Sequence, residues 1–292
     1  MIGKLVVCGV GLIGGSFAQA LKAAGAVGEV VGLGRTRAPL EEALRQGVID
    51  RIAKDWGDAL AGADLVLLGM PVGQMGPVMS ALKPHLEPRT LVTDGGSTKS
   101  DVVAAAREAF GDRIGQFVPG HPIAGAEKSG VAAARADLYR GKRVVLTPLA
   151  ENSTQAVAAV EAAWTACGAQ VSRLEPETHD RVFAAVSHLP HLLAFALVHE
   201  LAGRENSEQL FGFAAGGFRD FTRIASSHPE MWRDICLANR VALLEELDAF
   251  TAELDRTVSL LASGDGEGLE AMFATARARR EAWLGTLQPP GE

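Results

Sequence analysis

The sequence predicts an α/β domain built on a parallel sheet over residues 1–174, followed by an all-helical domain over residues 175–292. Three observations lead to this prediction. The chain opens with a β-branched apolar run, a glycine-rich turn and a helix of small residues. Strand and helix patterns then alternate as far as residue 173. From residue 178 onward only helical patterns follow, and a polar connector (residues 174–178) separates the two regions.

The N-terminal segment organises the first domain. Lys4–Cys8 is typical of a buried strand, and Gly9, Gly11 and Gly14 follow it as G-x-G-x-x-G before a helix predicted over Ile13–Ala24. The first glycine allows a tight turn, the second lets the backbone approach a pyrophosphate, and the third lets the helix pack on the strand. This order favours a Rossmann-type dinucleotide site at the helix N-terminus over an ordinary glycine-rich turn. The cofactor-binding residues predicted here are Gly9, Gly11, Leu12, Ile13 and Gly14.

The end of the second predicted strand, Glu29–Gly32, indicates which dinucleotide is bound. In an NAD-binding unit an acidic residue stands there and holds the ribose 2′-hydroxyl. Here Gly34 occupies that place, and Arg35, Thr36 and Arg37 follow it. No carboxylate is present to repel a 2′-phosphate, and two guanidinium groups can bind one. We therefore favour NADP, with NAD as the alternative if the arginines only face solvent.

The remaining patterns of the first domain alternate between strands and helices. The predicted strands are Asp64–Met70, Thr90–Thr93, Phe117–Val118 and, as closing strands, Lys142–Pro148 and Gln170–Arg173. The predicted helices are Pro39–Gly47, Val78–Leu86, one that begins near Asp101, and Thr154–Cys167. Pro71 ends the run that begins at Asp64, and we expect it beside the cofactor because ligands bind outside the carboxyl ends of parallel strands.

Two loops that follow predicted strands carry candidate catalytic residues. In DGGSTKS (residues 94–100), Ser97 could face a ligand or cap the next helix. In PGHPIAGAEKSG (residues 119–130), His121 stands between a glycine and a proline that restrict its backbone, and Glu127 adds a charge nearby. Histidine is suited to proton transfer near neutral pH, so the position favours catalysis by His121 over an incidental loop histidine.

The second domain is predicted to consist of helices that begin with a polar cluster. These helices are Thr178–Leu201, Glu208–Phe213, Pro229–Leu261 with breaks, and Gly268–Leu287. His188 and His191 share a helical face, and they suit the lining of a polar substrate pocket better than a metal site, because no third ligand has convincing spacing. His179, Asp180 and Ser187 could be helix caps.

Two arginines in the segment FRDFTRIA (residues 218–225) suggest that the helical domain captures an anion. We expect Arg223, more than Arg219, to face a pocket, because the residues around Arg223 are more apolar. The alternative for either arginine is a surface salt bridge.

Composition argues against several function classes. The chain has 292 residues, a net charge of −7 and no basic run, so neither nucleic acid nor an anionic membrane is an expected partner. Cys8, Cys167 and Cys236 are far apart, which argues against a disulfide framework or a cysteine-rich zinc site and fits a reducing compartment. We recognise no signal peptide and no apolar stretch long enough to cross a bilayer, and therefore expect a cytoplasmic protein.

Taken together, the motifs resemble those of the prephenate/arogenate (cyclohexadienyl) dehydrogenase family of tyrosine biosynthesis. The resemblance rests on GVGLIGGSFA, DGGSTKS, GHPIAGAEKSG, SHLPH, GGFRDFTRIA and PEMWRDI, in the family's order, up to about Asn239. It implies oxidative decarboxylation of prephenate or arogenate, to 4-hydroxyphenylpyruvate or tyrosine, with hydride transfer to NAD(P). It also implies a homodimer formed by the helical domain and an active site between the two domains.

The resemblance further implies roles for individual residues. His121 matches the histidine that accepts the hydrogen bond and the proton of the substrate hydroxyl, and Ser97 matches the serine that supports it. Arg223 matches the arginine that binds a substrate carboxylate. The remaining substrate-site residues implied are His188, His191 and Glu127.

The chain departs from the family pattern at Gly34, where many members carry an acid, and at Ala126, where some carry a hydroxyl residue.

One rival interpretation is a 3-hydroxy acid dehydrogenase, which generally uses a lysine of its helical domain, but Lys142 is the last lysine here. A second rival, a non-catalytic dinucleotide sensor, would not need His121 and Arg223 together. A methyltransferase is the weakest alternative, because the match continues past the glycine turn. The choice between prephenate and arogenate stays open, with a preference for prephenate or for both.

Overall fold

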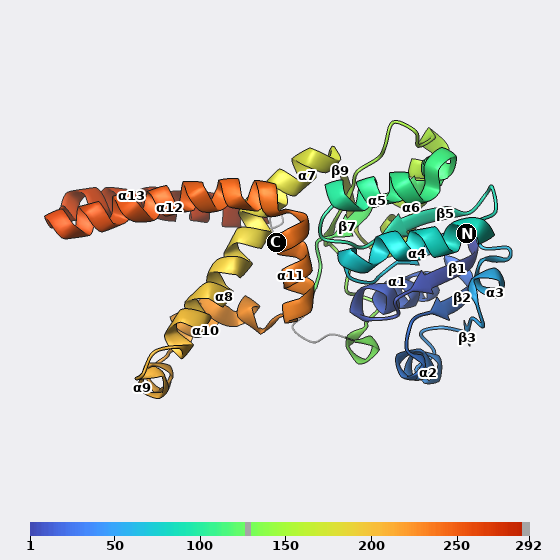
Figure 1. Ribbon diagram of the computed structural model, residues 1–292, viewed down its shortest axis with the longest axis horizontal. Helices are drawn as coiled ribbons and strands as arrows, with labels where there is room; N and C mark the ends of the chain where they lie inside the picture. Colours follow the sequence, from blue (N-terminus) through green and yellow to red (C-terminus); the bar gives the residue numbers. More distant parts are fainter. Residues whose placement is uncertain (126–129, 288–292) are drawn as a thin grey trace. The chain divides into compact units, whose positions relative to one another are not determined.

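A six-stranded parallel sheet forms the centre of the N-terminal region in the computed structural model, which describes residues 1–125 and 130–287 (Figure 1). The strand order is β3-β2-β1-β4-β5-β6, which is the Rossmann order with its reversal between β1 and β4. The strands are β1 (Ile2–Cys8), β2 (Val27–Leu33), β3 (Arg51–Ile52), β4 (Leu65–Leu68), β5 (Leu91–Asp94) and β6 (Phe117–Val118). The predicted Rossmann-type domain is therefore confirmed.

Helices follow these strands in the alternating order that the sequence predicts. They are α1 (Leu12–Ala23), α2 (Arg37–Arg45), α3 (Trp56–Leu60), α4 (Met75–Leu82), α5 (Ser100–Phe110) and α6 (Thr154–Ala166), with the 3-10 turns η1 (Val72–Gln74), η2 (Lys83–His85), η3 (Gly111–Gln116) and η4 (Val131–Ala133). The sequence patterns do not predict β3 or α3, because elements of two and five residues are too short to reveal a period.

The central strand β1 is buried on both faces, so its side chains contribute to two separate hydrophobic cores. Leu5 and Val7 belong to the core that includes Trp164 of α6, whereas Val6 and Cys8 belong to the core on the other face, which includes α4 and α5. Successive side chains of a strand point to opposite faces, and burial of both faces is characteristic of parallel sheets. This explains why the strand is read in the sequence as one continuous apolar run.

A second, three-stranded sheet carries the segment around His121. It consists of β7 (Gly120–Pro122), β8 (Arg143–Leu146) and β9 (Gln170–Arg173), with β7 antiparallel and β9 parallel to β8. The strands predicted over Lys142–Pro148 and Gln170–Arg173 are present, but they do not extend the nucleotide-binding sheet. Pro119 has no N–H with which to continue the β6 ladder, and the chain leaves the first sheet there. His121 accordingly lies in a strand opposite Val145, and its placement in a loop was wrong.

The rest of the chain is helical, as predicted. Its elements are α7 (Pro176–Phe183), a π-helical turn η5 (Ala184–His188), α8 (Leu189–Ala202), α9 (Ser207–Gly212), α10 (Gly216–Thr222), the 3-10 turn η6 (Arg223–Ser226), α11 (Pro229–Ala238), α12 (Arg240–Ser263) and α13 (Gly266–Leu287). The chain divides into two compact units, Met1–Leu243 and Leu244–Glu292. Within the second unit, the helices turn at Gly264, which has a φ of 68°, and Thr257 contacts Met272 across the hairpin.

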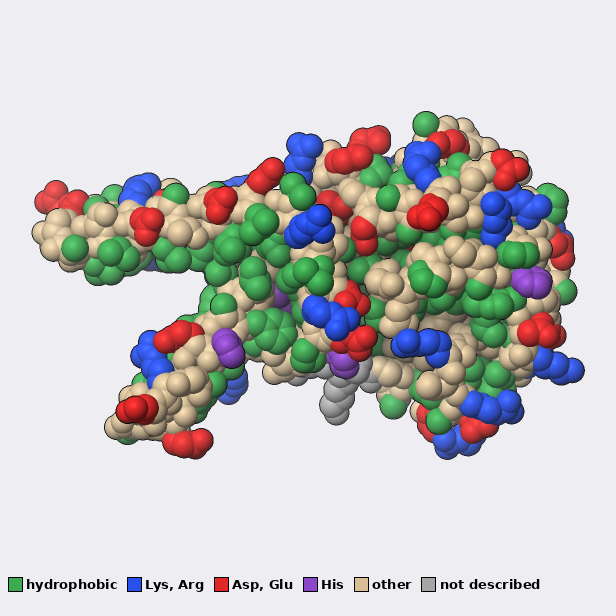
Figure 2. Space-filling model, viewed as in Figure 1, with side chains coloured by type: hydrophobic (Ala, Val, Ile, Leu, Met, Phe, Trp, Pro, Cys, Tyr) green, Lys and Arg blue, Asp and Glu red, His purple; other side chains and the backbone are tan. Residues whose placement is uncertain are grey.

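The hairpin of α12 and α13 exposes several large hydrophobic side chains. Figure 2 shows apolar side chains gathered along the hairpin. The exposed large hydrophobic residues among the described part of this unit are Leu244, Leu254, Val258, Leu261, Phe273 and Trp283.

One helix, Pro176–Ala202, is long and apolar enough to cross a membrane by length and composition, so the prediction that no stretch meets these criteria was wrong. Its window has a mean hydropathy of 1.6, and 28% of the window is buried. However, the helix contains the buried polar residues His179, Asp180 and His188, all hydrogen-bonded within the protein. It is also interrupted by a π-helical turn just before Pro190, which cannot donate a backbone hydrogen bond. These features fit a helix that packs within the protein.

Three glycines shape the turn between β1 and α1. Gly9 has a φ of 89°, in the region that favours glycine. A Cβ at Gly14 would collide with the carbonyl oxygen of Gly9 and would lie 2.7 Å from the Val7 side chain. A Cβ at Gly11 would have no atom within 4 Å. Gly14 is therefore required for packing, whereas the position of Gly11 opens onto free space.

We expect Gly14→Ala to lower the free energy of unfolding by about 1–3 kcal/mol, because the added methyl group overpacks the contact between α1 and β1. Thermal and urea unfolding measure the loss. The matched control is Gly285→Ala in α13, where nothing lies within 4 Å of the added Cβ and alanine should be neutral or stabilising. Equal stabilities of the two variants would contradict the packing role of Gly14.

Candidate active site

The carboxyl ends of β1 and β4 form a site that fits a dinucleotide. Gly11 is the N-cap of α1 and carries no side chain, so no side chain at this position covers the first N–H groups of that helix. Those groups have no intrahelical partners and can bind phosphate. Leu12 and Ile13 open the helix, and Pro71 is the N-cap of η1, shortly after the end of β4 at Leu68. These residues lie where the strand order reverses, which is where open α/β sheets bind their ligands.

The residues predicted to contact a 2′-phosphate lie just beyond the end of β2 and are all exposed. Thr36 is the N-cap of α2, and Arg37 forms an ion pair with Glu41, with 2.8 Å between Nε and Oε1. Arg35 has no hydrogen bond or ion pair with any residue in the described part of the chain. Arg35 is therefore the more available of the two guanidinium groups.

His121 lies close to this dinucleotide site. A Cβ added at Gly95, just after β5, would lie 2.8 Å from the side chain of Ile13 and 3.7 Å from that of Pro122. Ile13, in the first turn of α1, and Pro122, which follows His121, therefore both approach Gly95. This arrangement brings a histidine to the carboxyl edge of the sheet, as the sequence predicts.

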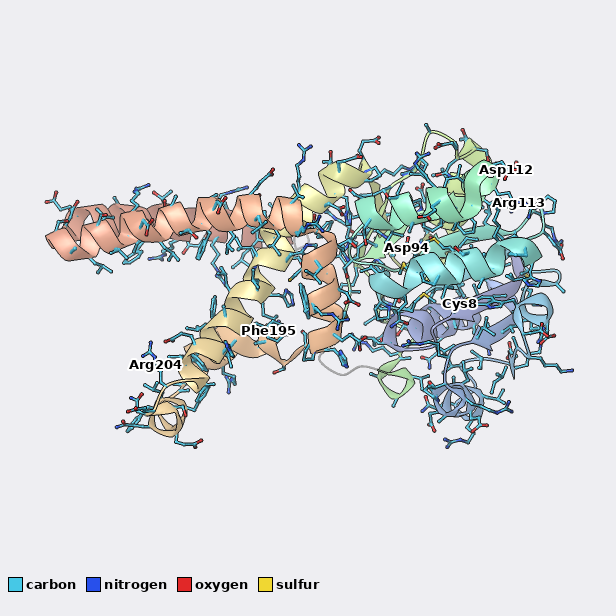
Figure 3. All side chains as sticks on the ribbon, in the orientation of Figure 1. Cys8, Asp94, Asp112, Arg113, Phe195 and Arg204 are labelled. Carbon is cyan, nitrogen blue, oxygen red and sulfur yellow. The ribbon has the colours of Figure 1, made fainter. Side chains whose placement is uncertain are left out.

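A buried ion pair fixes the backbone on the N-terminal side of His121. Asp94, labelled in Figure 3 at the end of β5, pairs with Lys99, and both side chains are fully buried. Lys99 Nζ also donates to the Gly120 carbonyl oxygen at 2.7 Å, and Asp94 Oδ1 accepts from the Gly120 N–H at 2.9 Å. Both backbone groups of Gly120 are thus bound, so the chain has little freedom where His121 begins.

The His121 side chain is bound through a second histidine to a carboxylate. His121 Nδ1 lies 2.8 Å from His179 Nε2, and His179 Nδ1 lies 2.8 Å from Asp180 Oδ1. The edge of Phe183 packs against the His121 ring, with 4.9 Å between the ring centroids. Burial, together with the nearby His179 and Lys99, holds the pKa of His121 well below its usual range. His121 is therefore neutral, as a general base must be before it accepts a proton.

Asp180 also caps a helix of the sheet region. Its carboxylate accepts hydrogen bonds from the N–H groups of Lys99 and Ser100, each at 2.8 Å, at the N-terminus of α5. Burial alone would raise the pKa of Asp180, but its hydrogen bonds with His179 and Ser100 lower it, so the carboxylate is ionised.

Of the residues suggested as helix caps, Asp180 is one, although it caps α5 and not its own helix, whereas His179, Ser187 and Ser97 are not. His179 and Asp180 lie inside α7, where His179 binds another histidine and Asp180 caps α5 in place of its own helix. Ser187 lies in the π-helical turn, so it does not cap a helix start. Ser97 does not cap α5 either, because the N-cap is Lys99. The half-buried Ser97 side chain has no hydrogen bond with the described residues, which leaves its hydroxyl available to a ligand.

His188 presents an unused hydrogen-bond donor. The amide nitrogen of Asn239 donates to the backbone carbonyl of Asp180 at 2.8 Å and lies 3.1 Å from His188 Nδ1. A carbonyl oxygen can only accept, so this nitrogen is the donor and His188 Nδ1 the acceptor. The proton of the neutral ring is then on Nε2, which is buried. No hydrogen bond of normal geometry binds this atom to the described residues, although the backbone of Ser97 lies near enough to act on the ring. Burial lowers the pKa of His188 to about 4, so the ring stays neutral.

His191 and Arg223 lie near each other on adjacent elements. His191 Nδ1 is 2.8 Å from the Ser187 carbonyl oxygen, and its ring stacks on Trp232 with 3.7 Å between centroids. Burial lowers the pKa of His191, and the positive charge of Arg223 lowers it further. Arg219, in contrast, has a side chain that is 81% exposed and pairs with its neighbour Asp220. The position beside His191 favours Arg223 as the anion-binding residue.

Neither a metal ion nor Glu127 can be assigned to the site from the described residues. Among residues 1–125 and 130–287, no group of three or more His, Cys, Asp or Glu side chains could hold a metal ion. Glu127, which the family resemblance assigns to the substrate site, lies outside the described residues.

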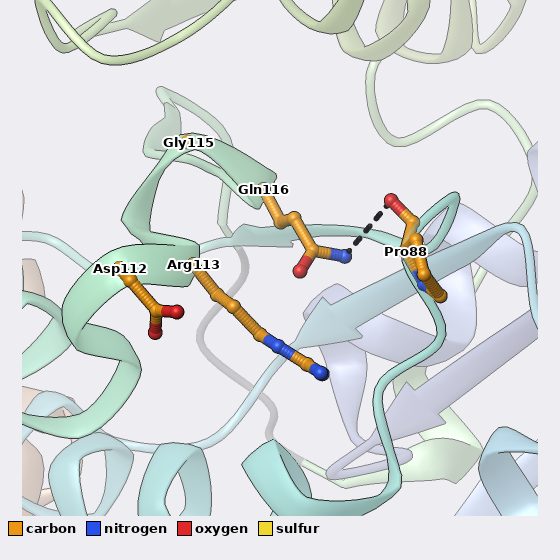
Figure 4. A pocket seen from close by; sticks show the side chains of 5 residues that line it. All are labelled: Pro88, Asp112, Arg113, Gly115 and Gln116. Carbon is orange, nitrogen blue, oxygen red and sulfur yellow. Dashed lines mark hydrogen bonds between the residues drawn. The ribbon is translucent and has the colours of Figure 1, made fainter.

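A separate depression of about 240 Å³ is not part of this site (Figure 4). It is lined by Pro88, Asp112, Arg113, Gly115 and Gln116. These residues precede β5 and β6, so the depression lies at the amino ends of the strands, whereas Rossmann-type domains bind ligands at the carboxyl ends.

Several residues of the site escaped the sequence analysis. Asp94 and Lys99 are part of the DGGSTKS motif but were not given a role. His179 and Asp180 were considered only as caps, and Asn239 and Trp232 were not singled out. The adjacent pair of polar residues in an amphipathic helix was the available signal for His179 and Asp180. The partner of His179, however, is His121, which lies 58 residues away in the chain. No local sequence pattern reveals such a contact.

Comparisons with known proteins show similarity over nearly the whole chain. The family model described as prephenate dehydrogenase, nucleotide-binding domain, matches residues 17–173. The model described as prephenate dehydrogenase, dimerization domain, matches residues 175–275. The histidines and Arg223 of the site all lie within these matched ranges.

Individual relatives agree with the family models. The prephenate dehydrogenase of Bacillus subtilis (strain 168) is 39% identical over 279 residues, which cover 95% of this chain and 75% of the relative. The cyclohexadienyl dehydrogenase of Zymomonas mobilis is 36% identical, with 94% of each chain covered. A crystal structure of the prephenate dehydrogenase from Aquifex aeolicus, in complex with hydroxyphenyl propionate and NAD+, is 36% identical with a TM-score of 0.89, and the match covers 97% of this chain and 99% of that one.

We expect Lys99→Met to lower the free energy of unfolding by about 3–5 kcal/mol, because it leaves the Asp94 carboxylate buried without a counter-charge. The double variant Asp94→Asn, Lys99→Met contains no uncompensated charge and should recover much of this loss. Urea unfolding of both variants measures the difference. A double variant no more stable than Lys99→Met would show that lost packing, and not the unpaired carboxylate, causes the destabilisation.

Proposed function

The chain belongs to the prephenate dehydrogenase family, and on this premise we propose that it oxidatively decarboxylates prephenate, arogenate or both. The hydride acceptor is a nicotinamide dinucleotide. The observation that carries the proposal is the neutral, buried His121 at the carboxyl edge of the sheet, close to the glycine turn that fits the pyrophosphate.

His121 is the base of the proposed reaction. It accepts the proton of the ring hydroxyl as hydride leaves the same carbon. Loss of CO2 then makes the ring aromatic as a phenolate, which takes the proton back to give the phenol. The nicotinamide, when bound, supplies the hydride acceptor. Aromatisation provides much of the driving force, so the protein needs mainly to position the substrate and to supply one base. The hydrogen bonds that hold the backbone and ring of His121 support this positioning role.

Arg223 and His188 are the proposed contacts to the substrate's oxygen atoms. The guanidinium group of Arg223 suits a carboxylate, which it can bind with two parallel hydrogen bonds. The unpartnered Nε2–H of His188 suits a neutral or anionic acceptor. Ser97 and His191 are proposed to line the same pocket, and Glu127 is proposed to stand at its mouth.

For the side chain of the substrate we propose a preference for prephenate, or activity on both compounds. Arogenate carries an ammonium group where prephenate carries a keto group. The Asp180 carboxylate is already occupied by His179, Lys99 and Ser100, so it is not available to pair with an ammonium group. A keto oxygen, in contrast, can accept from the donors of this site.

NADP is the proposed cofactor, with NAD as the alternative. Its support is the absence of an acidic residue at position 34 and the exposed Arg35 beyond β2. The proposed cofactor contacts are Gly9, Gly11, Leu12, Ile13, Gly14, Arg35, Thr36, Arg37 and Pro71.

We further propose that the protein is a cytoplasmic homodimer with a domain boundary between residues 174 and 175. The match of residues 175–275 to a dimerization domain and the exposed apolar side chains of α12 and α13 support association between copies. Three free cysteines fit a reducing compartment. The boundary is supported by the end of β9 at Arg173 and the start of α7 at Pro176.

The reaction is tested by an assay of prephenate and arogenate, each with NAD and with NADP, that follows reduced nicotinamide by absorbance. We expect turnover with prephenate and NADP. His121→Asn should lower kcat about 10²–10⁴-fold, the usual contribution of a general base, without changing cofactor affinity. The control His85→Asn alters an exposed histidine of η2. Cofactor binding without turnover in any combination would favour the sensor interpretation, and an active His121→Asn enzyme would assign the base to another residue.

The anion site is tested by a pair of arginine variants. We expect Arg223→Ala to raise KM roughly 10–100-fold with a smaller effect on kcat, because a charged hydrogen bond contributes about 1.5–3 kcal/mol. Arg219→Ala should leave KM within about twofold, because Arg219 is solvent-exposed. The reverse pattern in steady-state kinetics would move the carboxylate site to Arg219.

The cofactor preference is tested in the same way. Arg35→Ala should weaken NADP binding about tenfold or more and leave NAD binding nearly unchanged, because only NADP carries the 2′-phosphate. Arg37→Ala should have a smaller effect, since Arg37 is paired with Glu41. Titration of both variants with both cofactors gives the comparison. Equal weakening of NAD and NADP by Arg35→Ala would contradict a contact with the 2′-phosphate.

A further inference from the structure

The hydrogen bonds from His121 to Asp180 have one consistent direction. The Asp180 carboxylate is ionised and can only accept, so the proton between it and His179 belongs to His179 Nδ1. A neutral His179 then has a lone pair on Nε2, which can only accept from His121 Nδ1. The proton of the neutral His121 ring is therefore on Nδ1, and its Nε2 carries the free lone pair.

We propose that His179 and Asp180 act as positioning residues that hold His121 in this tautomer and receive the positive charge when it takes the substrate proton. The proposal rests on the proposed function of His121 as the base. As Nε2 of His121 binds the hydroxyl proton, the Nδ1 proton moves to Nε2 of His179. His121 ends neutral with its proton on Nε2, and His179 becomes an imidazolium ion bound to the Asp180 carboxylate. No proton is gained or lost in this exchange.

The surroundings explain why the charge should move away from His121. Besides His179, the groups that act on the pKa of His121 are Lys99 and His188, and neither is an anion that could stabilise an imidazolium ion. The Asp94 carboxylate at Gly120 is already paired with Lys99 and bound to the Gly120 N–H. His179 also lies near Lys99, but it contacts Asp180 directly and has Asp94 in its vicinity. Burial lowers the pKa of His179, and both carboxylates oppose that shift. The second histidine is thus the better position for a positive charge.

A purely structural role would not require this arrangement. Asp180 caps α5 through the N–H groups of Lys99 and Ser100, and that function needs no histidine beside it. His179 is fully buried, where an apolar ring would pack without the cost of burying a polar group. The order His121, His179, Asp180 resembles catalytic sites in which a carboxylate orients a histidine. There the carboxylate fixes the tautomer of the histidine and stabilises its positive charge.

The tautomer can be measured without any enzymatic turnover. Nitrogen-15 NMR of the full-length protein, with His121 assigned by its loss in His121→Asn, reports which ring nitrogen carries the proton. We expect protonated Nδ1 and unprotonated Nε2 in the wild-type protein. His179→Phe removes the acceptor and should shift His121 toward the Nε2–H form. A wild-type His121 protonated on Nε2 would overturn the proposal, whether or not the protein turns over prephenate or arogenate.

The kinetic test uses His179→Gln, whose side-chain oxygen can accept from His121 Nδ1 but cannot take up the proton. We expect kcat to fall about 10–100-fold, with KM and cofactor affinity within about twofold. The acid limb of the kcat–pH profile should move to lower pH, because the base loses the partner that stabilised its protonated form. His85→Gln, the same change in an exposed histidine, is the control.

Asp180→Asn gives an independent check. It should show the same shift of the acid limb, whereas a merely structural role would lower thermal stability and leave the shape of the profile unchanged. Wild-type kcat and an unshifted acid limb in His179→Gln would overturn the relay. Absence of turnover in the wild-type protein would instead count against the proposed function, and the NMR result would still decide the hydrogen-bond order.

Discussion

The site depends above all on the hydrogen bonds of a single carboxylate. Asp180, on α7, accepts from His179 on its own helix and from two N–H groups at the start of α5 in the sheet region. The same contact therefore satisfies a helix N-terminus, joins the first helix after the sheet to the Rossmann-type region and orients the histidines. Loss of this carboxylate would leave buried N–H groups unsatisfied and His179 without its partner, so folding and chemistry share one interaction.

Charge is distributed so that His121, the proposed base, stays neutral while fixed charges surround it. Lys99 and Asp94 neutralise each other in full burial and together hold Gly120. Burial and neighbouring groups keep His121 and His188 uncharged. Within the described residues, the buried polar atoms left without partners include His188 Nε2 and Trp232 Nε1. Unpaired buried donors are costly, and a ligand that accepts from them would explain those beside the candidate site.

Much of the fold could be predicted from the sequence because its signals are local. The glycine turn, the apolar strands and the loss of alternation after residue 173 each depend on neighbouring residues, and they correctly indicated a Rossmann-type region followed by helices. The choice of His121 came from its position after a predicted strand, and the preference for Arg223 over Arg219 came from the more apolar residues around Arg223; both stay predictions. The separate sheet formed by β7, β8 and β9 could not be predicted, because strand partners are chosen by long-range packing. The contacts of His121 with His179, and of Asp180 with α5, span 58 and about 80 residues and leave no periodic trace.

The most direct test of this account is a crystal structure of the protein with NADP and hydroxyphenyl propionate, the compound bound in the Aquifex aeolicus relative. We predict that the phenolic hydroxyl lies within hydrogen-bond distance of His121 Nε2, with the Nδ1 atom still bound to His179. We also predict that Arg223 contacts the carboxylate and that Arg35 contacts the 2′-phosphate. A hydroxyl group bound elsewhere, with His121 Nε2 facing neither ligand nor cofactor, would contradict the assignment of His121 as the base.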